Sequence, residues 1–282
     1  MSGVWRFAAA LTGTRYRIRH VADDEPENPT PYWHVQSLIV SELAFNVAYG
    51  IRPDFGIEAM IPLRSVKDEV HYLDLAGEPY TPPNPGLHHR DETLTRLADP
   101  QLTFQFGHAF KPVNVSGRVG LSVPLGKTEP NPFELGRQGL WHQHIQFGSG
   151  TWDPILGIAL SRKFGELDTQ FCGYARLTFA ENSHGYKAGN RYSGLFDVSH
   201  KIGSAWSMSG GLVLNNESAE RWSGIIETEG NLGRTDLLVA IGAGRTFKTA
   251  GVMSINVQVP IASHSTGEQV KIPWVLSIGW ER

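Results

Sequence analysis

The sequence predicts an all-β protein, a transmembrane antiparallel up-and-down β-barrel of about 12 strands that occupies residues 1–282 as one domain. Three observations favour this fold. Apolar residues alternate with polar ones in many short segments, and short turns alternate with long loops between them. The apolar runs, such as Ile155 to Leu160, are far shorter than the roughly 18 residues of a membrane helix. A barrel strand needs no such run, because only every second residue contacts lipid.

The alternation is clearest from Val113 to Leu125, where Val and Leu share one parity while Asn, Ser and Arg fall on the other. The segments Gln36 to Tyr49 and Phe55 to Arg64 flank a turn at residues 52–54 and predict a hairpin. The same pattern predicts further strands at 14–21, 101–109, 152–163, 167–180, 191–201, 205–214, 236–247, 251–261 and 271–280.

The connections between these segments support a membrane barrel. Five turns of a few residues alternate with long polar loops, as do the periplasmic turns and external loops of bacterial outer-membrane barrels. We therefore expect an outer-membrane protein of a Gram-negative bacterium that contacts lipid, with both termini at the short-turn end. The long loops are 22–35, 67–98, 126–150, 181–190, 215–235 and 262–270.

A soluble all-β barrel or sandwich is the alternative fold, because it also alternates polar and apolar residues. Its polar parity would be rich in Lys, Glu and Asp, whereas here that parity carries mainly Asn, Ser, Thr, Gln and Gly. Export requires a signal peptide, and the apolar run Phe7 to Leu11 is shorter than the 7 to 15 residues expected. Either the chain is a mature form, or its true start lies upstream, or the protein is cytoplasmic.

Composition excludes several functions. The formal net charge of −3 and the absence of any Lys/Arg block argue against nucleic acid as a partner. The single cysteine, Cys172, cannot form an internal disulfide and is expected to be a small wall residue. No Gly-x-Ser-x-Gly elbow or P-loop is present, and the glycines at 242 and 244 fall inside a strand pattern, so we expect no enzyme activity.

Charged residues at inward positions predict a polar lumen. They could form wall-to-wall ion pairs that stiffen the barrel, or they could shape the field of a pore. The predicted lumen-lining residues are Arg15, Arg17, Arg19, Glu42, Glu58, Arg64, Arg118 and Arg176.

Histidines gather in two of the predicted external loops. His142 and His144 share one face of an extended segment, about 7 Å apart, and His88, His89 and Glu92 lie in the preceding long loop. Imidazole is a common ligand of copper and zinc, so these five residues are the candidate metal site at the external mouth. The alternative is hydrogen-bonded histidines that pack the rim.

Several segments resemble a broad family of outer-membrane transporters of the kind labelled phenol-degradation-pathway channels. The resemblance is carried, in order along the chain, by Asp99 to Leu102, Val119 to Gly126, Gly148 to Gly157 (GSGTWDPILG) with Phe164-Gly165, Val257 to Ile261, Thr266 to Gln269 and Val275 to Gly279. It implies a β-barrel and passive uptake of small, often hydrophobic molecules. The end, Trp280-Glu281-Arg282, departs from the terminal aromatic usual in such barrels.

The sequence thus predicts a porin-like channel or transporter for passive passage of small solutes, with copper or zinc as the candidate metal at its mouth. The alternative is a non-conducting barrel that anchors or scaffolds an envelope protein complex.

Overall fold

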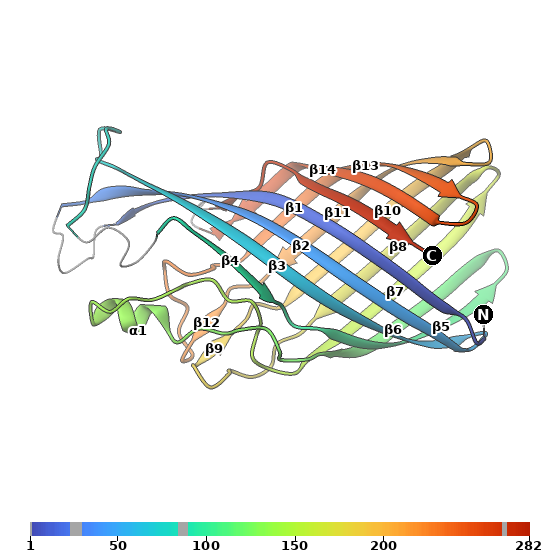
Figure 1. The fold of residues 1–282 in the computed structure, drawn as a ribbon, viewed down its shortest axis with the longest axis horizontal. Helices are drawn as coiled ribbons and strands as arrows, with labels where there is room; N and C mark the ends of the chain where they lie inside the picture. Colours follow the sequence, from blue (N-terminus) through green and yellow to red (C-terminus); the bar gives the residue numbers. More distant parts are fainter. Residues whose placement is uncertain (1, 23–29, 84–89, 267–269) are drawn as a thin grey trace.

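The computed structural model describes residues 2–22, 30–83, 90–266 and 270–282, and their strands form a closed antiparallel barrel (Figure 1). Each barrel strand pairs with its neighbours in the sequence, and β1 pairs with both β2 and β16, which closes the cylinder. The expected barrel of 12 strands is therefore confirmed. Its strands are β1 (Trp5–Ala22), β2 (Tyr32–Arg52), β3 (Phe55–Leu73), β5 (Gln101–Phe110), β6 (Val113–Ser122), β7 (Asp153–Phe164), β8 (Leu167–Arg176), β10 (Arg191–Ile202), β11 (Trp206–Glu217), β13 (Arg234–Phe247), β14 (Gly251–Ser265) and β16 (Val275–Glu281).

The remaining elements all lie in the long loops. The short strands β4 (Glu92–Leu97) and β15 (Val270–Lys271) pair with β3 and β1. A separate two-stranded sheet joins β9 (Tyr186–Lys187) to β12 (Arg221–Trp222), and α1 (Pro132–Arg137) is capped by the Asn131 side chain. No helix in the described part of the chain is long and apolar enough to cross a membrane.

The two ends of the barrel differ as the sequence predicts. All five tight turns and both termini lie at one end, where the Phe7 N–H donates to the Arg282 carbonyl at 2.8 Å (Figure 1). The long loops lie at the other end, which we call the outer end. The predicted loop 67–98 differs from the structure: β3 continues to Leu73, and β2 and β3 extend with β1 beyond the other strands. The three strands stay paired at this end, where Arg19 is the register partner of Val35 and Val35 is that of His71.

The outer surface carries an apolar belt. On β2 and β3 the exposed Phe45 and Ile61 are register partners, while Glu42 and Arg64 pair on the inner face. Exposed aromatic side chains flank the belt near the short turns and again near the long loops. They include Trp5, Phe110, Phe164 and Trp206 at the first position and Trp152, Phe179 and Trp274 at the second. An apolar band between two aromatic girdles is the surface that a transmembrane barrel presents to lipid.

Candidate functional site: the lumen and its outer cap

Ion pairs line the inner wall of the barrel. Arg64 donates two hydrogen bonds to the Glu42 carboxylate, with Nη2 at 2.7 Å. Arg118 Nη2 lies 3.3 Å from Glu58 Oε2, which also accepts a hydrogen bond from Gln105. Both pairs run along the wall between nearby strands, so they neutralise charge without crossing the lumen.

The middle of the lumen is hollow. A cavity of about 640 Å³ is bounded by side chains from opposite parts of the wall, among them Arg6 of β1, Gln105 of β5 and Gln170 of β8. Glu58, Arg118 and Tyr174 also contribute to its lining. Cationic, anionic and amide groups thus alternate around this space, which suits a water-filled passage better than a dry core.

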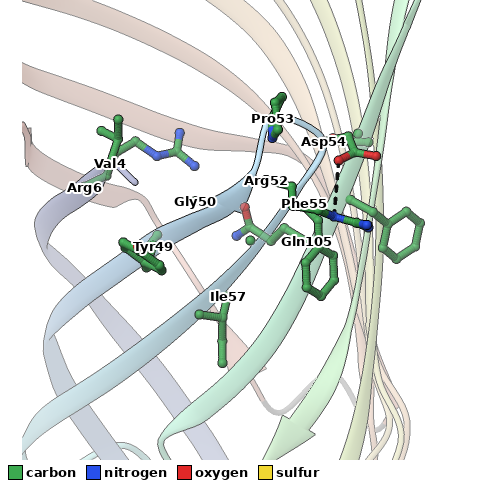
Figure 2. Close-up of a pocket in the computed structure, with 15 residues that line it drawn as sticks. Val4, Arg6, Tyr49, Gly50, Arg52, Pro53, Asp54, Phe55, Ile57 and Gln105 are labelled. Carbon is green, nitrogen blue, oxygen red and sulfur yellow. Dashed lines mark ion pairs between the residues drawn. The ribbon is translucent and has the colours of Figure 1, made fainter. Parts of the chain in front are cut away.

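A second cavity, of about 250 Å³, lies at the short-turn mouth beside the turn between β2 and β3 (Figure 2). Figure 2 shows the Arg52–Asp54 ion pair at this turn, with 3.8 Å between Arg52 Nε and Asp54 Oδ1. Both cavities include Arg6 and Gln105 in their linings. The two spaces therefore adjoin, and the hollow of the lumen continues to the short-turn end.

The outer part of the lumen is filled instead. Inward side chains at the outer ends of the strands are buried, including Asp153 and Ile155 at 0 % exposure and Asp236 at 2 %. Charged side chains there are paired: Arg191 donates to Glu217 at 3.0 Å, and Arg234 Nε lies 2.8 Å from the buried Asp236 Oδ2. The lumen is thus asymmetric, open toward the short turns and packed toward the long loops.

Three long loops pack together over this outer end, and we call them the outer cap: residues 126–150 with α1, 177–190 with β9, and 218–233 with β12. Their apolar core consists of Phe133, Tyr186, Ala188 and Trp222. The Tyr186 and Trp222 ring centroids are 4.7 Å apart, and the Trp222 indole donates to the Glu220 carboxylate at 3.1 Å. Burial raises the pKa of Glu220, because the charged carboxylate is poorly solvated inside the cap.

Asp99 anchors the cap to the barrel wall. Its carboxylate, 4 % exposed, accepts hydrogen bonds from Gly126 N at 2.8 Å, from Ser149 N at 2.7 Å and from Ser149 Oγ at 3.2 Å. A Cβ on Gly148 would lie 2.9 Å from both Asp99 Cγ and Gly126 Cα, so only glycine permits this close approach. Asn182 donates to the Ser149 carbonyl at 3.1 Å and joins the second loop to the anchor.

The anchor was not predicted as a site, although its two halves were visible in the sequence. Asp99-Pro100-Gln101-Leu102 and the GSGTWDPILG segment from Gly148 both carried the family resemblance. Their contact with each other depends on long-range pairing, since Asp99 and Ser149 are 50 residues apart.

Five of the predicted lumen-lining residues lie on the inner face: Glu42, Glu58, Arg64, Arg118 and Arg176. Arg15, Arg17 and Arg19 do not. They share the odd parity of Trp5 and Leu11, which are exposed on the outside, and the β1–β2 register is unbroken between them. The prediction for these three arginines is therefore wrong. Their regular alternation showed that they share a face, but polarity alone misassigned that face, because β1 extends beyond the belt into a polar environment.

The described residues do not support the predicted metal site. Among them, no group of three or more His, Cys, Asp or Glu side chains could hold a metal ion. The His142 and His144 ring centroids are 5.2 Å apart, but His142 Nδ1 lies 2.8 Å from the Leu140 carbonyl and His144 packs edge-on against Phe133. Glu92 interacts with Arg90 and Gln143. These contacts fit rim packing. His88 and His89 lie outside the described residues.

A buried acid lies on the inner face of β3 beyond the belt, where its neighbours Lys67 and Glu69 form an ion pair on the outside. Gln36 Nε2 donates to Asp68 Oδ2 at 2.6 Å. Burial raises the pKa of Asp68 to about 6, and the nearby Glu92 carboxylate adds to this effect, while the Gln36 hydrogen bond opposes it.

No protein-family model and no curated protein matches the chain. The fold is similar to that of the COG4313 outer membrane channel from Pseudomonas putida F1, with a TM-score of 0.63 and 11% identity over 100% of this chain and 96% of that one. A deletion mutant of TodX, a monoaromatic hydrocarbon channel, has a TM-score of 0.50 and 8% identity over 100% of this chain and 91% of that one. These identities show the fold alone. It is the fold of outer-membrane barrels, and together with the apolar belt it locates the chain in an outer membrane.

Proposed function

We propose that this protein is a passive outer-membrane channel for small solutes, without chemical conversion of what passes. The observation that carries the proposal is the 640 Å³ cavity in the middle of the barrel, which adjoins the space at the short-turn mouth. A barrel that served only as an anchor could fill its interior along the whole length. Here the inward side chains pack tightly only at the outer end.

The lining also indicates the class of solute. Arg6, Glu58, Arg118 and two glutamines provide donors and acceptors on several sides, so a small solute with at least one polar group can exchange hydrogen bonds with water for hydrogen bonds with the wall. The two similar structures named above are described as channels, one of them for monoaromatic hydrocarbons. An amphipathic aromatic solute, such as a phenol, would satisfy both observations and the sequence resemblance.

Conductance across a planar lipid bilayer tests the proposal. We expect discrete current steps from the purified protein, whereas a barrel that never conducts at any voltage would favour the scaffold role. Blockade of the single-channel current then tests the solute class. At equal concentration phenol should reduce the current more than benzene does, because only phenol exchanges hydrogen bonds with the wall, and equal reduction by both refutes the class.

A further inference from the structure

The outer face of β1 changes from apolar to basic along its length. Trp5, Phe7 and Leu11 are exposed on this face, and Arg15, Arg17 and Arg19 follow with the same parity. Figure 1 shows that β1, β2 and β3 continue past the other strands at this end. The arginines therefore project outward from the barrel wall, on the side of the long loops.

The height of these arginines follows from strand geometry. A strand rises about 3.3 Å per residue, and a tilt of roughly 40° reduces this to about 2.5 Å along the barrel axis. A belt about 25 Å tall that starts at Trp5 then ends near Arg15. Trp274, which is 42 % exposed, comes directly before Val275, the register partner of Thr14, so this aromatic side chain lies at the same height as Arg15. Arg17 and Arg19 lie about 5 and 10 Å farther out, at the depth of lipid headgroups.

Neighbouring strands add positive charge to this surface. Lys271 is the register partner of Arg17. Lys67 is the register partner of Ile39, which in turn pairs with Arg15, so Lys67 lies at the same level as Arg15. We call Arg15, Arg17, Arg19, Lys67 and Lys271 the basic patch. The Glu69 carboxylate lies among them, with Oε1 2.7 Å from Lys67 Nζ and Oε2 3.8 Å from Arg15 Nη2.

The outermost cations of the patch differ from Arg15 and Lys67 in their contacts. Within the described residues, Arg17, Arg19 and Lys271 form no ion pair with a carboxylate, and Arg19 is held with its guanidinium 4.0 Å above the Trp33 ring. In the sequence, acidic residues follow β1 between Asp23 and Glu27, outside the described residues. Any test of the patch therefore uses the full chain.

The geometry points to a binding site for the phosphate groups of outer-leaflet lipid, a phosphorylated glycolipid of the lipid A type. The patch is continuous with the lipid-facing belt, so the acyl chains of a bound lipid would lie along Phe7 and Leu11 while its phosphates reach Arg17 and Arg19. Guanidinium groups bind phosphate through paired, charge-assisted hydrogen bonds. This lipid contact is separate from the lumen and from the channel role.

Binding of diphosphoryl lipid A to the detergent-solubilised full-length protein, measured by native mass spectrometry, tests the inference. We expect Arg17→Gln/Arg19→Gln to bind roughly tenfold more weakly than wild type, the loss expected for two solvent-exposed charge pairs. The matched control is Arg162→Gln/Arg245→Gln, which removes two exposed arginines that stack on aromatic rings at the short-turn end. This control should bind like wild type.

Two further arms keep the result interpretable. Dephosphorylated lipid A should bind wild type roughly tenfold more weakly than diphosphoryl lipid A does, and this comparison needs no variant to fold. Inorganic phosphate at equal concentration should not displace the lipid if the belt contributes to binding. Equal loss in both arginine variants, or binding of the dephosphorylated lipid as tightly as the diphosphoryl form, would overturn the proposal.

Discussion

Removal of the Asp99 carboxylate should release the outer cap. In Asp99→Ala the N–H groups of Gly126 and Ser149 lose their acceptor while they remain close to the wall. Each hydrogen bond to a charged group contributes about 1.5–3 kcal/mol, so the two backbone bonds together hold the cap by about 3–6 kcal/mol. Every 1.4 kcal/mol corresponds to about a tenfold change in an equilibrium, so the ratio of released to anchored cap should rise by roughly 10² to 10⁴.

Two measurements follow this change. Amide hydrogen exchange in residues 126–150 should accelerate by a similar factor, because release of the cap exposes these amides. Single-channel recordings should show a higher open probability if the cap closes the outer end. Glu166→Ala is the control: its carboxylate is exposed in the turn between β7 and β8, far from the cap, and lines neither cavity, so neither quantity should change.

The two readouts separate two possible errors. Unchanged exchange in Asp99→Ala would refute the assignment of Asp99 as the anchor. Faster exchange with an unchanged open probability would show that the anchor is correct but that the cap does not gate the channel.

Three further predictions concern the same regions. Gly148→Ala should raise the open probability as Asp99→Ala does, because the added Cβ crowds the Asp99 carboxylate; an open probability equal to that of wild type would contradict this. In the lumen, Glu58→Gln should shift the reversal potential in a KCl gradient toward anion preference, since Arg118 loses its carboxylate partner, and Arg118→Gln should shift it the other way; identical potentials would place the ion path elsewhere. Because the pKa of Asp68 is raised from 3.8 to about 6, its native surroundings favour the protonated acid, so the structure around β3 and β4 should lose stability as pH rises from about 4 to 6 and change little above that. Hydrogen exchange of β4 amides, corrected for the intrinsic pH dependence, should show this in wild type and not in Asp68→Asn.

Much of the barrel could be predicted from the sequence because a transmembrane strand leaves a local signature. Residues that contact lipid and residues that face the lumen alternate, so Val113 to Leu125 indicated β6 with no knowledge of its partners. The lengths of the connections indicated which end of the barrel each turn occupies. The turns that join β2 to β3 and β5 to β6 lie where the sequence placed them.

The tertiary structure decided which face of β1 carries its arginines and which loops meet over the mouth. Alternation showed that Arg15, Arg17 and Arg19 share a face, but whether that face is inside or outside depends on where the strand leaves the membrane. That position is set by its register with β2 and β16. Asp99 and Ser149 likewise meet only because the closed barrel brings the ends of distant strands together. Period-two alternation is a property of one strand, whereas the anchor and the basic patch each depend on several strands. The sequence of one strand does not show which residues of other strands will lie beside it.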